Sequence, residues 1–122
     1  MEKYINVMKH ASELQVTVYE GLQHMQTLLN DGKFEDTIPL FNNIVEAFSV
    51  VENSVVTLPK EVFSNETQSL TTKVKDALNL VVSSFELKNF GKIQEILQFT
   101  LIPSYKKWME ELDEMFQPYL VS

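Results

Sequence analysis

The stretch QHMQTLLNDGKFEDTIPLFNNIVEAFSVV, residues 23–51, places two apolar stripes of helical period on either side of a turn. Apolar residues recur at spacings of three and four along both stripes, as they do from Ile44 to Phe48 and Val51. Between the stripes, residues 30–33 are Asn-Asp-Gly-Lys, which are residue types typical of a tight turn. Two amphipathic helices joined by a short turn make an αα-hairpin, so this stretch predicts an antiparallel helix pair.

The helical period extends over four long segments, which are separated by the few glycines and prolines of the chain. These segments are residues 2–30, 34–57, 66–87 and 90–117. In the first segment the apolar stripe consists of Tyr4, Val7, Ala11, Leu14, Val18, Leu22, Met25 and Leu29. Because the first and third joints are short, the helices should form two αα-hairpins that close into an up-down-up-down four-helix bundle. We expect one all-α domain over residues 1–122.

A weak internal repeat relates the two predicted hairpins. A shift of 56 residues pairs Leu14 with Leu70 and Phe34 with Phe90, and a shift of 57 pairs Phe48 with Tyr105 and Val51 with Trp108. Shared helical spacing produces some such matches by chance. If the repeat is genuine, the bundle has two similar halves, and each half carries an aromatic residue just after its turn.

Pro103 lies inside the fourth segment, within Leu101-Ile102-Pro103-Ser104. Proline lacks a backbone N–H, and its ring clashes with the carbonyl group four residues earlier. The hydrogen bond to the Phe99 carbonyl is therefore lost, and we expect a kink near residues 99–103.

The charge of the chain argues against nucleic acids and membranes as partners. There are 17 acidic and 10 basic residues, which gives a net charge of −7, and every basic residue is lysine. Phosphate backbones and anionic lipid surfaces repel such a chain. The arginine fork that recognises guanine and phosphate is also absent. The acidic composition otherwise favours solubility.

Cysteine is absent, so disulfides and zinc–cysteine sites are excluded. The chain begins Met1-Glu2-Lys3 without a charged-then-apolar leader, and no apolar run approaches 18 residues. We therefore expect a cytoplasmic protein. A purely lysine basic set together with many asparagines indicates a bacterial source.

The only two histidines, His10 and His24, lie on one flank of the first helix. Fourteen residues of helix separate them by about 21 Å, so they cannot bind one metal ion together. The Glu-x-x-His motifs of di-iron bundles do not occur in the sequence. We expect no metal, no cofactor and no catalytic residue, and the chain is not predicted to be an enzyme.

Glu52 is the one carboxylate that the helical wheel places on an apolar face. A buried, unpaired carboxylate is costly, so such a group is paired, protonated or close enough to the surface to reach solvent. Either Glu52 reaches solvent near the end of its helix, or it is a buried carboxylate. Our hypothesis is that it pairs with a lysine or tyrosine of a neighbouring helix.

Several apolar residues lie off the core stripes and make up a candidate partner-binding surface. They are Ile5, Val16, Tyr19, Leu80, Leu87, Ile96 and Phe99. If they are contiguous, a partner helix or a second copy of the chain would cover them, as in a homodimer. The alternative is that these residues fill gaps in an irregular bundle.

Residues 30–41, NDGKFEDTIPLF, resemble hairpins of small uncharacterised helical proteins of Bacillus-type bacteria. The architecture is also similar to bundle-type flagellar export chaperones. The resemblance implies a protein-interaction or chaperone-like function that works by burial of apolar surface, and it carries over no functional residue. The alternatives are a small-ligand sensor, with its site in the core near Tyr105 and Trp108, and a metal-binding bundle or enzyme.

Overall fold

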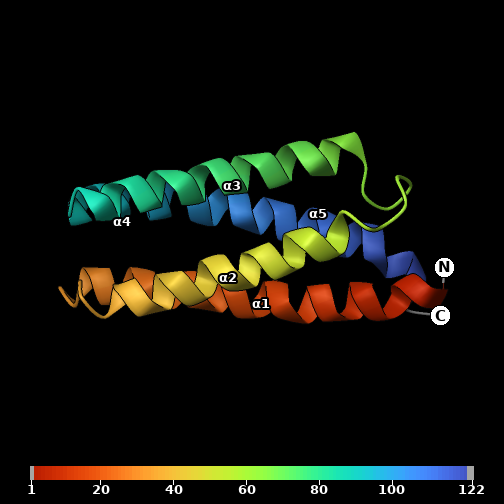
Figure 1. Cartoon of the computed structure of the whole chain (residues 1–122), viewed down its shortest axis with the longest axis horizontal. Coiled ribbons are helices and arrows are strands. Elements are labelled where there is room, and N and C mark those ends of the chain that lie inside the picture. Colours follow the sequence, from red (N-terminus) through yellow and green to blue (C-terminus); the bar gives the residue numbers. More distant parts are fainter. Residues whose placement is uncertain (1, 121–122) are drawn as a thin grey trace.

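The computed structural model describes residues 2–120 as a bundle of four long helices. The elements are α1 (Glu2–Asn30), α2 (Thr37–Val55), α3 (Asn65–Glu86), α4 (Phe90–Ile96), the π-helical segment η1 (Leu97–Leu101) and α5 (Ile102–Leu120). Because α4, η1 and α5 follow one another without a break, they form the fourth long helix (Figure 1). The described residues contain no strand. The predicted all-α four-helix bundle is confirmed.

The helices end where local chemistry allows the chain to turn. Gly32 has a φ of +75°, which glycine adopts without strain, and it follows α1. The Ser64 hydroxyl caps the start of α3 by accepting a hydrogen bond from the Thr67 N–H, and Asn89 caps α4 in the same way. The second helix begins at Thr37 rather than at residue 34, so Pro39 lies in its first turn, where a missing N–H costs little.

The interruption expected near Pro103 takes the form of the π-helical turn η1. The Ile102 N–H donates to the Leu97 carbonyl, five residues earlier. A π turn holds one residue more than an α turn. The internal repeat changes from a shift of 56 to one of 57 between Phe90 and Tyr105, so the second half of the chain has one extra residue there. The π turn absorbs that residue.

The buried seam of α1 differs from the predicted stripe in its first half. Met8 and Gln15 are fully buried, whereas Val7 and Leu14 are only half-buried. The buried residues of α1 follow a heptad-like spacing, and they are Met8, Ala11, Gln15, Val18, Leu22, Met25 and Leu29. A seam that follows neighbouring helices repeats every 3.5 residues, so a wheel at 100° per residue drifts away from it. This drift of the wheel explains why the predicted stripe contains Val7 and Leu14 in place of Met8 and Gln15.

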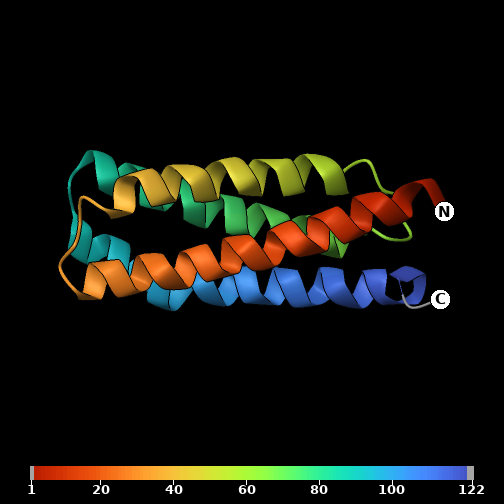
Figure 2. The same ribbon diagram turned by 90° about the horizontal axis from the view of Figure 1, so that it is seen from below.

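The two hairpins pack in equivalent ways, but the two interfaces between the hairpins differ. Within the hairpins, α1 packs closely on α2, and α3 packs closely on α4 and α5. Between the hairpins, α1 also packs closely on α5, and Figure 2 shows α1 beside both α2 and α5. The backbones of α2 and α3, which face the viewer in Figure 1, approach each other less closely. One side of the bundle is therefore closed and the other is open.

Residues that the repeat relates also meet across the bundle. The Phe34 and Phe90 rings stack with their centroids 4.6 Å apart, which places the two turns against each other. At mid-bundle the Tyr105 hydroxyl donates to the Gln15 carbonyl at 2.7 Å. The Trp108 indole N–H donates to the Thr71 hydroxyl at 2.8 Å. Since Gln15 and Thr71 are 56 residues apart, each half of the repeat anchors one side chain of α5.

Gln15 has a buried side-chain amide that the rest of the described chain leaves without a hydrogen bond. An unpaired buried amide costs about 1–3 kcal/mol in lost hydration. We predict that Gln15→Leu raises the free energy of unfolding by about 1–2 kcal/mol, because leucine keeps the volume and removes the polar atoms. Urea denaturation would show a higher midpoint at an unchanged slope. The exposed residue Gln23 supplies the control, and a less stable Gln15→Leu would contradict the prediction.

Candidate functional site

The open side of the bundle contains three connected hollows between α2 and α3. The largest hollow has a volume of about 650 Å³ and lies between Ile38 and Phe85. It is at the end of the bundle where the two hairpins turn, which we call the wide end. The second, about 290 Å³, shares Ile38 and Phe85 and adds Val82. The third, about 90 Å³, shares Val82 and reaches Glu52. Because neighbouring hollows share lining residues, they lie next to one another in a row, which we call the α2–α3 groove.

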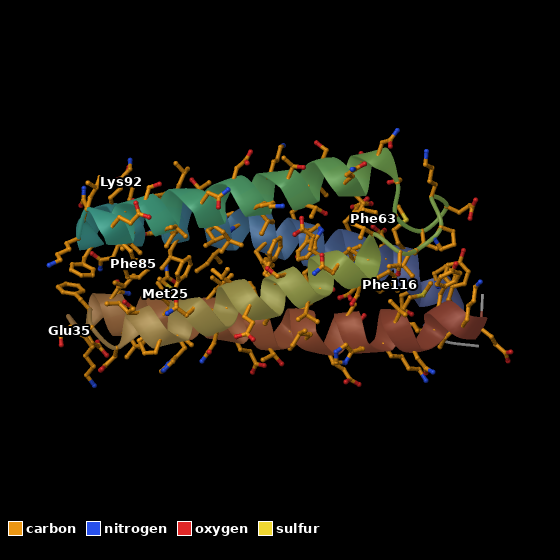
Figure 3. The ribbon with its side chains drawn as sticks, in the orientation of Figure 1. Met25, Glu35, Phe63, Phe85, Lys92 and Phe116 are labelled. Carbon is orange, nitrogen blue, oxygen red and sulfur yellow. The ribbon has the colours of Figure 1, made fainter. Side chains whose placement is uncertain are left out.

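The floor of the α2–α3 groove is aromatic at its wide end. The rings of Phe41 and Phe85 lie 5.2 Å apart, and Phe85 meets Phe90 edge-on at 6.3 Å. Figure 3 shows Phe85 directed from α3 toward α2, with Glu35 at the same end of the bundle. Phe85 and Phe90 are only half-buried, so part of this aromatic surface is in contact with solvent.

The rims of the groove carry exposed aliphatic side chains on both walls. Ile38 of α2 is 46% exposed and Val82 of α3 is 38% exposed. Both line the 290 Å³ hollow. An aliphatic residue on each side of an aromatic floor makes an apolar cleft that faces solvent.

An ion pair crosses the narrow end of the groove. The Lys75 Nζ lies 3.4 Å from a carboxylate oxygen of Glu52 and donates a hydrogen bond to it. The partner of Glu52 is thus a lysine of a neighbouring helix. The expectation that Glu52 is buried was wrong, since its side chain is 22% exposed. Solvent reaches the carboxylate because α2 and α3 do not approach closely there.

The two sides of the bundle carry different residue types at positions that the repeat relates. The repeat relates Lys75 to Tyr19 and Glu52 to Met109. On the closed side Tyr19 stacks on Tyr105 at 6.1 Å, and Met109 is half-buried against the core. Apolar and aromatic side chains thus lie at these positions on the closed side, whereas an ion pair lies at the related positions between α2 and α3.

The wide end shows the same difference. The repeat relates Asn30 to Glu86 and Gln94 to Ile38. On the closed side the Gln94 amide donates to the Asn30 side chain at 3.1 Å. Ile38 and Glu86 cannot form such a bond, and both line the groove instead. At these positions, too, the open side lacks the contact that joins the helices of the closed side.

The residues predicted to bind a partner are scattered, and one of them was assigned wrongly. Ile96 is 5% exposed and belongs to the core. The helical wheel treats residues 97–101 as α-helix, although η1 is π-helical. The extra residue of the π turn rotates Ile96 by about 100° relative to the apolar stripe of α5. Ile5 and Tyr19 are half-buried, and the exposed members are Val16, Leu80, Leu87 and Phe99.

None of these residues lines the α2–α3 groove, so the sequence analysis missed the groove itself. The repeat contains a signal for the groove, because Lys75 and Ile38 differ in polarity from Tyr19 and Gln94, the residues that match them. The differences could not be interpreted without knowing that α2 faces α3.

Within the described residues, the structure assigns no metal-binding role to the histidines and no ligand-binding role to the core aromatic residues. Within residues 2–120 no three His, Asp or Glu side chains gather in a way that could hold a metal ion, and His10 and His24 are exposed. The core rings of Tyr105 and Trp108 pack against each other at 5.4 Å and line none of the hollows described above. Burial raises the pKa of Tyr105 far above its ordinary value, and the Asp113 carboxylate adds to this, so the hydroxyl remains a donor.

The fold and the groove define an all-α, four-helix-bundle domain. A family model described as a domain of unknown function, DUF8042, matches residues 6–111, and the chain belongs to this family. No curated protein and no solved structure matches the chain. The match says nothing of export chaperones, so that likeness stays a prediction. None of the helices within residues 2–120 combines the length and the apolar character needed to cross a membrane.

Replacing the ion pair by the residues of the closed side tests the origin of the groove. We predict that Glu52→Met combined with Lys75→Tyr raises the free energy of unfolding by about 1–2 kcal/mol. The half-exposed pair contributes only about 0–1 kcal/mol, which is less than the apolar burial gained. Chemical denaturation measures the change, and each single variant serves as a control. A double variant less stable than the parent protein would show that charge does not keep the groove open.

Proposed function

We propose that this protein is an interaction module that binds a helix of a partner protein in the α2–α3 groove. The main support for the proposal is that the two interfaces between the hairpins differ in how closely they are packed. One is closed by stacked and hydrogen-bonded side chains, and the other leaves Ile38 and Val82 exposed above an aromatic floor. An exposed apolar cleft on a small domain is typical of a recognition site.

The dimensions of the groove favour a helix as the occupant. From Ile38 to Glu52 the α2 wall covers 15 residues, or about 21 Å of helix. The hollows follow one another along this line, as the anchor positions i, i+3, i+4 and i+7 of an amphipathic helix would require. A helix laid between α2 and α3 would supply the packing that Tyr19 and Met109 supply on the closed side.

Few exposed aliphatic side chains line the groove, and the binding should therefore be reversible. Burying an aliphatic side chain completely contributes about 1.5–3 kcal/mol, and Ile38 and Val82 are already partly covered. Association also costs translational and rotational freedom. Weak binding of an exposed helix is suited to a small chaperone-like protein that covers a partner's apolar stripe and later releases it. In this proposal the protein binds and does not catalyse.

A neutral amphipathic peptide tests the proposal. The probe is a synthetic 18-residue helix with a leucine stripe and glutamine on its other face, titrated into isotopically labelled protein. We predict that the amide resonances of Ile38, Val82 and Phe85 shift, and that Val82→Glu weakens binding at least about tenfold, or about 1.4 kcal/mol. A charge placed in the apolar cleft would have to be desolvated when the peptide binds.

Leu80→Glu is the matched control, because Leu80 belongs to the same helix, is 53% exposed and does not line the groove. It should bind the peptide as the parent protein does. If Leu80→Glu abolishes binding and Val82→Glu does not, the interaction surface lies on the outer face of α3. If no resonance shifts, the proposed function is wrong.

A further inference from the structure

Charged residues of the α2–α3 groove are arranged unevenly along its length. At the narrow end, Glu52 and Lys75 neutralise each other. At the wide end, the exposed carboxylates of Glu35 and Glu86 line the hollows on opposite walls. Among the described residues, Lys88 in the turn beyond α3 is the cation that lines these hollows, and Lys33 lines an adjoining hollow with Glu35. A carboxylate thus stands on each side of the apolar cleft.

The wider surroundings are acidic on balance, although Lys33 lies beside Phe34 in the turn before α2. From Thr37 to Val55, α2 contains Glu46 and Glu52 and no basic residue. Asp36 lies beside Glu35 just before α2. With a net charge of −7, the chain attracts cationic partners over distances of about a Debye length.

The same charges disfavour a second copy of the chain as the occupant. A two-fold contact through the groove would bring Glu35 and Glu86 of each copy toward those of the other. Like charges across an interface cost free energy, and two molecules of charge −7 repel each other as they approach. A basic partner meets complementary charge at the same positions.

We infer that the occupant of the α2–α3 groove is a basic amphipathic helix, with lysine or arginine beside its apolar stripe. Its apolar residues enter the cleft between Ile38 and Val82, and its cations lie against Glu35 and Glu86. This inference rests on the proposed function and adds the chemistry of the partner to it.

Three synthetic helices with the same leucine stripe and different flanks test the inference. The flanking residues are lysine, glutamine or glutamate, and binding is measured by fluorescence anisotropy of labelled peptides. The lysine peptide should bind at least about tenfold more tightly than the glutamate peptide at low ionic strength. Raising the salt concentration to 0.5 M should remove most of this difference, since exposed charges are screened.

Paired variants separate recognition at the groove from the effect of net charge. Glu35→Gln with Glu86→Gln should weaken binding of the lysine peptide by about threefold or more and leave binding of the glutamine peptide unchanged. Glu110→Gln with Glu114→Gln makes the same change in net charge on the exposed face of α5 and should have a smaller effect. Equal effects of the two double variants would overturn the inference.

The remaining outcomes are distinguishable. If the lysine and glutamate peptides bind equally well, the inference about charge fails while the proposed function stands. If none of the peptides binds, the proposed function fails as well. Sedimentation of the protein alone completes the test. A dimer that Val82→Glu dissociates would assign the groove to a second copy and overturn the basic-helix inference.

Discussion

Each hairpin of this protein can cover its apolar stripe only by packing against the other hairpin. The two halves are similar, so they meet through related residues, as the stacked rings of Phe34 and Phe90 show. The hydrogen bonds from Tyr105 to Gln15 and from Trp108 to Thr71 then fix how far α5 is inserted between α1 and α3. The remaining features of the bundle depend on this pairing of near-equal halves.

Two similar halves need not produce two equal interfaces. A perfect repeat would close both sides of the bundle in the same way. Here Lys75 and Glu52 stand where Tyr19 and Met109 close the other side, and the ion pair they form keeps its water. The α2–α3 groove thus lies at an interface that the fold itself provides, where α2 and α3 pack less closely than α1 and α5.

The same comparison explains the irregular fourth helix. An extra residue in the second half would rotate every later side chain by about 100° and move the stripe of α5 away from the core. The π turn before Pro103 takes up that residue, so that Ile93 and Ile96 before it and Tyr105 and Trp108 after it are all buried. The proline follows the turn, where the α-helical hydrogen-bond pattern is already interrupted.

The four helices, their turns and the hairpin order were predictable from the sequence, because helical period and turn chemistry are properties of neighbouring residues. The sequence also identified exposed apolar residues such as Leu80 and Phe99 correctly. The tertiary structure decided which side of the bundle stays open, why Gln15 is buried and why Ile96 is not on the surface. Those features depend on side chains from helices far apart in the chain, whose sizes and charges matter only once the helices face each other.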